Sequence, residues 1–332
     1  MDYRLESFPL LREFLTYHET IRGHARKTSD EYFLDLRAFF RFLKRQRGLV
    51  PTDAKLEEIP IGDVALPLVA SVTLTDVYEY MAYLARERAN QPNSPNTGYG
   101  LGTAARARKV AAIRSLYRYL TAKAHLLSEN PVQELDSPKI KKTLPRYLSL
   151  EESLRLLSTV EGPQRDRDYC ILTLFLNCGL RISELAGLNL ADVRDDTLRV
   201  VGKGNKERLL YLNDACREAL RRWLTIRATL PSLDKQALFL SHLHRRISVK
   251  GIHFTVKKRL QAAGLDTDLY SSHKLRHTAA TLMLQNGVDV RTLQELLGHE
   301  HLNTTQIYTH VEDGELRAAA RANPLSKVKP AR

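Results

Sequence analysis

The stretch LGHEHLNTTQIYTH, residues 297–310, gathers three histidines, a glutamate and a tyrosine within fourteen positions. Three interpretations are open: a metal site, a nucleophile with its helpers, or the polar end of a buried helix. A zinc site is disfavoured, because no cysteine or aspartate joins His299, His301 and His310. Tyr308 becomes a candidate nucleophile only if cations surround it, because its phenol is neutral at ordinary pH and its anion needs stabilisation.

Two further stretches contain arginines that could bind an anion. In GLRISELAGL, Arg181 follows a glycine-containing turn at the predicted start of a helix, and Glu184 lies three residues later on the same face, where it can hold the guanidinium. In SSHKLRHTAATLMLQNG, His273 and Arg276 are three residues apart on a predicted helix and point the same way. A metal pair of His273 and His277 is disfavoured, because Arg276 would repel a cation. The planar guanidinium of Arg276, with two parallel N–H donors, suits phosphate oxygens instead.

The stretch GKGNKER places two lysines around a turn that is flanked by glycines and can bend. Lys203 could swing into a site opposite it, and Lys206 lies further round the turn. Taken singly, these residues have simpler explanations: a surface ion pair, a solvated turn lysine or a core tyrosine. Their occurrence together, in the order Arg, Lys, His, Arg, His and Tyr within a basic second half, favours one shared anion site.

The elements that must position these residues are mainly helices. Four segments of the first part have apolar residues every three or four positions, which predicts amphipathic helices. These segments span 7–23, 28–48, 73–89 and 103–125. Thr28 or Ser29 is the expected cap of the second helix. Residues 90–102, rich in Asn, Pro and Gly, are expected to form a loop.

The second part is predicted to be mainly helical, with a small antiparallel sheet. The runs 197–201 and 207–212 flank GKGNK and predict a β-hairpin, and ALFLS at 237–241 is a further candidate strand. The predicted helices span 149–158, 166–179, 214–230, 250–264, 273–286, 290–297 and 303–310, with another beginning near Arg181 and a short one in the C-terminal tail.

Basic residues gather on one face of the helix at 103–125 and in SPKIKKTLPRYLS, residues 137–149. A solvated surface would explain them, but such a face is also suited to lie along phosphates. The candidate contacts to a DNA backbone are Arg106, Arg108, Lys109, Arg114, Arg118, Lys141 and Lys142. The two prolines and weak periodicity after 136 predict a helical DNA-binding domain at 1–136, a linker at 137–145 and a second domain at 146–332.

Composition limits the class of protein. The chain has 332 residues, a net charge of +13 and 43% hydrophobic residues, which favours two folded domains and argues against disorder. The charge favours a polyanionic partner, nucleic acid before an anionic membrane. No secretory signal or membrane-spanning stretch is visible. The three cysteines lack CxxC spacing and are expected to be reduced thiols of a cytoplasmic protein.

The chemical residues together resemble those of the tyrosine recombinase (phage integrase-type) family, and most closely its Xer-like bacterial members. The matching residues are Arg181 in GLRISEL, Lys203 in GKGNKER, His273 and Arg276 in HKLRHT, His299 in LLGHE, and Tyr308 in TTQIYTH. The resemblance is strong over 146–311 and weaker in the first part, where TSDEYFLDLRAFFRFL resembles the core-binding domain of the family. Residues 49–72 and 90–102 are longer than a minimal member needs.

The resemblance implies a SAM-like helical core-binding domain and a mixed α/β, mostly helical catalytic domain with a tail helix. It also implies site-specific recombination through a covalent 3′-phosphotyrosyl intermediate and a Holliday junction. Tyr308 would attack the scissile phosphate, Arg181 and Arg276 would hold its non-bridging oxygens, and Lys203 would protonate the departing 5′-oxygen.

His273 and His299 would donate further hydrogen bonds to that phosphate, and Glu184 would orient Arg181. The implied partners are double-stranded DNA with a specific site and a homotetramer on two synapsed duplexes, or a second recombinase. No metal, ATP or other cofactor is expected, because protein cations neutralise the phosphate. Chromosome dimer resolution and movement of a mobile element both fit. A non-catalytic architectural DNA-binding protein and a metal phosphodiesterase are the alternatives.

Overall fold

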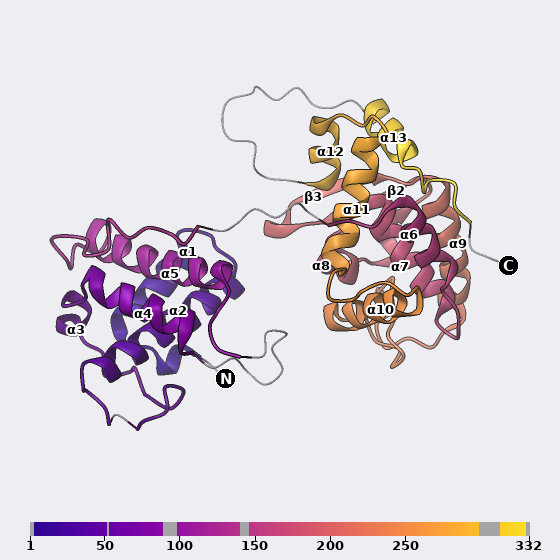
Figure 1. The fold of residues 1–332 in the computed structure, drawn as a ribbon. Coiled ribbons are helices and arrows are strands. Elements are labelled where there is room, and N and C mark those ends of the chain that lie inside the picture. Colours follow the sequence, from indigo (N-terminus) through magenta and orange to yellow (C-terminus); the bar gives the residue numbers. More distant parts are fainter. Residues whose placement is uncertain (1–2, 52, 89–97, 140–145, 299–312, 330–332) are drawn as a thin grey trace. The chain divides into compact units, whose positions relative to one another are not determined.

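The computed structural model describes all residues except 1–2, 52, 89–97, 140–145, 299–312 and 330–332 (Figure 1). The chain divides into two compact units, Met1–Thr143 and Leu144–Arg332. The described residues are mainly helical, with one three-stranded antiparallel sheet, as the sequence predicted. Within the described ranges, no helix has both the length and the apolar character that a bilayer span requires.

The first unit is a bundle of helices around an aromatic core. Its elements are η1 (Tyr3–Glu6), α1 (Pro9–Thr20), α2 (Arg26–Gln46), α3 (Leu66–Ala70), α4 (Leu74–Arg86) and α5 (Thr103–Ala122). The periodicity of α2 turns Phe33, Phe39 and Phe40 inward, where each is almost fully buried. The predicted cap of this helix was wrong: α2 begins at Arg26 after Ala25, so Ser29 lies inside the helix and contacts His18.

The second unit contains the sheet and the remaining helices. Its helices are α6 (Leu150–Ser158), α7 (Arg165–Cys178), α8 (Ile182–Gly187), α9 (Asp214–Thr229), α10 (Val249–Ala262), α11 (Ser272–Gln285), α12 (Val290–Leu297) and α13 (Asp313–Ala322), with short turns η2 (Leu190–Asp192) and η3 (Lys203–Asn205). The strands are β1 (Val193–Arg194), β2 (Thr197–Val201) and β3 (Glu207–Tyr211), in the order β1-β2-β3. The predicted hairpin is thus confirmed, with η3 at its tip.

Helix α7 is the centre of the second unit. Every residue from Arg167 to Cys178 is buried, which explains why apolar residues occur on all sides of this helix rather than on one face. Its buried charges are paired, because Asp168 accepts hydrogen bonds from both Arg167 and Arg259. All three cysteines of the chain are buried and free.

The candidate strand at 237–241 does not form. Its backbone makes only isolated bridges, Asn189 with Ala237 and Leu240 with Arg246. Two of its carbonyl groups accept from side chains: Trp223 Nε1 donates to Leu238 O at 2.9 Å, and Arg167 Nη1 donates to Leu240 O at 2.9 Å. Burial of the apolar run therefore required long-range donors, which the local pattern could not reveal.

Candidate active site and DNA interface

The turn between α7 and α8 brings the first arginine of the predicted site into position. Gly179 ends α7 with φ +58°, and a Cβ built there would lie 2.6 Å from Leu297 Cδ2. Only glycine allows both this left-handed conformation and the close approach of α12. Two residues later, Arg181 caps α8, and its backbone N–H donates to Glu184 Oε2 at 2.8 Å.

Glu184 fixes the Arg181 side chain as the sequence predicted. Arg181 Nη1 donates to Glu184 Oε1 at 2.7 Å, and the carboxylate is almost fully buried. Burial alone would raise the pKa of Glu184, but hydrogen bonds and charge from Arg208, followed by those from Arg181, outweigh it and hold the pKa below its ordinary value. The carboxylate is therefore ionised and can anchor guanidinium groups at neutral pH.

Arg276 of α11 reaches the same place from another helix. Its Nη1 donates to Gly179 O at 2.6 Å, its Nη2 donates to Leu297 O at 2.7 Å, and Nη1 lies 3.9 Å from Glu184 Oε2. Burial and the neighbouring charge of Arg181 lower the pKa of Arg276 to about 10, so it stays protonated at neutral pH. Both guanidinium groups therefore lie within ion-pair distance of the same carboxylate, and two such forks suit an anion with two acceptor oxygens.

Arg208 of β3 is a functional candidate that the sequence analysis missed. Its Nη1 and Nη2 donate to the two oxygens of Glu184, each at 2.9 Å, and its Nε donates to Leu296 O at 3.1 Å. In the sheet Arg208 is paired with Val200, which is fully buried. In a strand, Arg208 lies on the same face as the buried Leu210, which is the one feature of the sequence that pointed to an inward arginine. The apolar run Leu209–Leu210–Tyr211 obscures this alternation.

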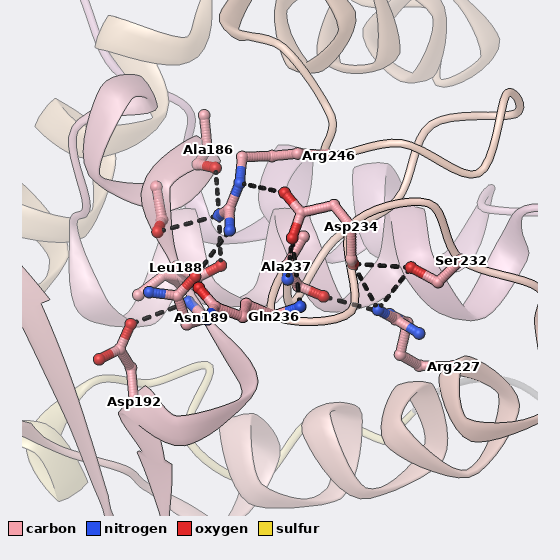
Figure 2. A network of polar contacts seen from close by, with 11 residues as sticks. Ala186, Leu188, Asn189, Asp192, Arg227, Ser232, Asp234, Gln236, Ala237 and Arg246 are labelled. Atoms are coloured by element: carbon pink, nitrogen blue, oxygen red, sulfur yellow. Dashed lines mark hydrogen bonds and ion pairs between the residues drawn. The ribbon is translucent and has the colours of Figure 1, made fainter.

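The C-terminal end of α8 is held by a second polar network (Figure 2). Arg246 Nη1 donates to the carbonyl oxygens of Ala186, Gly187 and Leu188, at 3.3, 3.1 and 2.9 Å. Its Nε binds Asp234 Oδ2 at 3.0 Å. These bonds satisfy carbonyls that a helix end leaves without partners. Helix α8 is thereby fixed at both ends, which sets the position of Arg181.

The remaining predicted site residues are placed only in part. His273 and His277 are exposed on α11. The ring of His277 is still partly desolvated, and this partial burial, with the charges of Lys274 and Arg276, lowers its pKa. Lys203 lies in η3 at the hairpin tip. Lys206 follows it and is exposed. His299, His301, Tyr308 and His310 lie outside the described residues. Among the described part of the chain, no group of three His, Cys, Asp or Glu could hold a metal ion.

The first unit contains a basic cavity of about 460 Å³ next to α1 and α5. Arg22, Arg114, Arg118 and Lys123 line it, and none of the described lining residues is acidic. His18 lies there too, stacked on His24 with 4.1 Å between ring centroids. Burial, with the charges of His24 and Arg22, lowers the pKa of His18 to about 4, so His18 is neutral at ordinary pH.

The basic face predicted on α5 needs one correction. Lys109 is buried, and its Nζ lies 2.7 Å from Asp35 Oδ1, so its charge is already neutralised inside the bundle. Arg108 is exposed but pairs with Glu31 and Asp35. Arg106 is half-buried and contacts Thr103. Arg114 and Arg118 line the cavity, while Lys141 and Lys142 lie outside the described residues. An amphipathic pattern assigns a helix face, but the ion pair with α2 decided which cations remain available.

The sequence of this chain is similar to a known protein family and to several named proteins. The model of the phage integrase family matches residues 146–315. A protein called tyrosine recombinase XerC from Caldanaerobacter subterraneus subsp. tengcongensis is 52% identical over 96% of this chain and 88% of its own length. A second protein called tyrosine recombinase XerC, from Vibrio atlanticus, is 33% identical over 89% of this chain and 94% of its own length.

Two solved structures share the fold. XerH site-specific recombinase bound to difH substrate has a TM-score of 0.58 and 23% identity, covering 93% of this chain and 84% of that chain. A lambda integrase tetramer bound to a Holliday junction has a TM-score of 0.57 and 18% identity, covering 90% of this chain and 80% of that chain.

Proposed function

The chain belongs to the phage integrase family and is a tyrosine recombinase, and we propose that it resolves chromosome dimers by strand exchange at a specific DNA site. The enzyme cleaves and rejoins DNA strands through a covalent 3′-phosphotyrosyl intermediate. The observation that carries the proposed site is the placement of Arg181 and Arg276 around the buried Glu184. The extent of its likeness to the XerC relatives favours the chromosomal role over a mobile element.

The reaction begins when Tyr308 attacks the scissile phosphorus in line. Arg181 and Arg276 hold the two non-bridging oxygens, where negative charge builds in the transition state. His273 and His299 donate hydrogen bonds to the same phosphate, and one of them accepts the tyrosine proton. The P–O bond to the 5′-oxygen breaks as the new bond to Tyr308 forms, so the number of phosphoester bonds does not change.

Lys203 is the proposed acid for the departing 5′-oxygen. An alkoxide is a poor leaving group, and an ammonium group at the tip of a hairpin can reach it. Gly204, next to Lys203, has φ +72°, a left-handed turn that glycine adopts readily. A 5′-hydroxyl from a second duplex then attacks the phosphotyrosyl bond and reverses the chemistry. The fixed cations replace a metal ion, and the retained ester bond replaces ATP.

The proposed assembly is a tetramer on two synapsed duplexes, with two subunits on each site. A site of two half-sites is therefore expected, because paired subunits impose their symmetry on the DNA. A second recombinase in place of half of the subunits fits the same geometry. Action on the chromosome would place the protein in the cytoplasm. The non-catalytic alternative has no support from the relatives, which are named as recombinases.

Adduct formation tests the proposed function directly. Footprinting on genomic fragments would first locate the bound site, and the full chain would then be incubated with a nicked duplex of that sequence. We expect a covalent protein–DNA adduct that survives denaturation and forms in EDTA without ATP. Cleavage that stops in EDTA and leaves no adduct would indicate a metal phosphodiesterase. Binding without cleavage would indicate an architectural protein.

Electrostatic contacts from the first unit are expected to set much of the DNA affinity. Replacing both Arg114 and Arg118 by glutamine removes two cations from the basic cavity. The slope of log K against log salt should become less steep by about 1.8, and affinity in about 0.1 M salt should fall on the order of 10-fold to 100-fold. Filter binding or anisotropy over a salt series measures both quantities.

Lys55→Gln is the matched control, because Lys55 is an exposed cation of the same unit that pairs with Glu58 and lies outside the cavity. Its salt slope should equal that of the wild type. An unchanged slope in the double variant would show that the cavity is not a phosphate-binding surface.

A further inference from the structure

Three arginines end on three consecutive carbonyl groups at the C-terminal end of α12. The pairs are Arg208 Nε with Leu296 O at 3.1 Å, Arg276 Nη2 with Leu297 O at 2.7 Å, and Arg181 Nη2 with Gly298 O at 3.0 Å. The carbonyl end of a helix carries partial negative charge, so it attracts this row of cations. The segment that continues from Gly298 leads to His299 and Tyr308. The three hydrogen bonds therefore connect Arg181 and Arg276, the proposed phosphate ligands, with the end of α12, where that segment begins.

Of these three arginines, Arg208 also donates hydrogen bonds to both carboxylate oxygens of Glu184. Its two terminal nitrogens are each 2.9 Å from a carboxylate oxygen, while the same carboxylate holds Arg181 Nη1 at 2.7 Å. Removing Arg208 would leave Glu184 buried with less compensating charge and with freedom to turn. Arg181 would then lose the fixed direction that its own contact with Glu184 provides.

We propose that Arg208 is a positioning residue for the recombination reaction: it locks Glu184 and the end of α12 in one register so that Arg181 and Arg276 meet the same phosphate. This inference rests on the proposed function of the site. Arg208 acts through other residues, because all three nitrogens of its guanidinium contact Glu184 or the carbonyl of Leu296.

Gly298 supports the same role. It ends α12 with φ +65°, and a Cβ built there would lie 3.2 Å from Arg208 Cδ and Nη1. The guanidinium of Arg208 thus packs against the backbone at the point where the chain leaves α12. A glycine gives both the left-handed conformation and the room for this contact.

The test uses the full chain and the nicked duplex, with Arg208→Gln and Arg208→Lys. Binding affinity, the adduct-forming rate at saturating DNA and the thermal unfolding temperature are measured for each variant. We expect Arg208→Gln to bind DNA like the wild type and to form adduct between about 10-fold and 100-fold more slowly, as expected for misplaced catalytic groups. Arg208→Lys keeps the charge but loses the two-pronged contact, so its rate should be intermediate.

The pH dependence separates positioning from general stability. The charged groups that face Glu184 are Arg181, Arg208 and Arg276. Without Arg208, burial is less compensated and the pKa of Glu184 should rise. The rate of Arg208→Gln relative to wild type should therefore fall further as the pH is lowered, because protonated Glu184 no longer holds Arg181 by charge.

Arg259→Gln is the matched control for loss of a buried ion pair. Arg259 Nε and Nη2 bind Asp168 Oδ2 at 2.9 and 2.5 Å, with the side chain 5% exposed. This variant should unfold at a lower temperature than the wild type. Its folded fraction should form adduct at the wild-type rate. A second check combines Arg208→Gln with Arg181→Lys, where the combined loss should be smaller than the product of the single losses.

Two results would overturn the inference: a wild-type saturating rate in Arg208→Gln, or an equal rate loss in Arg259→Gln at matched loss of stability. If Arg208→Gln does not fold, the same comparison is decided by Arg208→Lys and Arg259→Lys. The wild type distinguishes failure of the proposed function from failure of this inference. If the proposed function is wrong, the wild type forms no adduct although Arg208 is present, and the inference then fails as well.

Discussion

Replacing Tyr308 by phenylalanine is expected to abolish covalent attachment to DNA while leaving DNA binding intact. The substitution removes one oxygen atom, which is the atom proposed to bond to phosphorus. Loss of a nucleophile that no neighbour can replace lowers the rate by at least about 10⁴-fold. The measurement is adduct formation on the nicked duplex after denaturation, followed by mass analysis of the DNA-linked peptide, which should contain residue 308.

Tyr147→Phe provides the control for this substitution. Tyr147 belongs to the same unit, and its hydroxyl accepts a hydrogen bond from Gln285 at 3.0 Å. That variant should form adduct at the wild-type rate. Adduct formation by Tyr308→Phe at a comparable rate would remove Tyr308 from the mechanism, and attachment to a peptide from elsewhere would identify another nucleophile.

Replacing Arg276 by lysine is expected to give the second-largest loss of activity. Lysine keeps the charge but cannot span Gly179 O and Leu297 O as the guanidinium does, and it presents no planar fork to phosphate. Losing one strong donor to a developing oxyanion lowers the rate by about 10²-fold to 10³-fold. The adduct-forming rate at saturating DNA measures the loss, and the affinity for DNA should change much less.

A neutral scissile group tests the reason for that loss. A methylphosphonate replaces one charged non-bridging oxygen by a methyl group, so less charge needs to be neutralised there. The difference between wild type and Arg276→Lys should shrink on this substrate if Arg276 acts by stabilising charge. An undiminished difference, with a large fall in unfolding temperature, would assign the defect to the structural bonds of Arg276 with Gly179 and Leu297.

The sequence by itself determined the helical architecture and the chemical inventory. Helices α2, α4 and α5 follow from apolar residues at three- and four-residue spacing, and the hairpin follows from two short runs around GKGNK. These features depend on neighbours in the chain, which is why local patterns predict them. The spacing of Arg181 and Glu184 also predicted their contact, because three residues on a helix place side chains on one face.

Only the tertiary structure decided which charged side chains remain available and which are held by others. Lys109 was predicted to face DNA but is neutralised by Asp35, which lies 74 positions earlier in the sequence. Arg208 lies in the predicted strand 207–212 and was not among the candidate site residues, yet it joins β3 to Glu184 and to the end of α12. A buried charge must find its partner wherever the fold brings one close. Such pairings depend on packing between distant segments, and periodicity along the chain does not encode them.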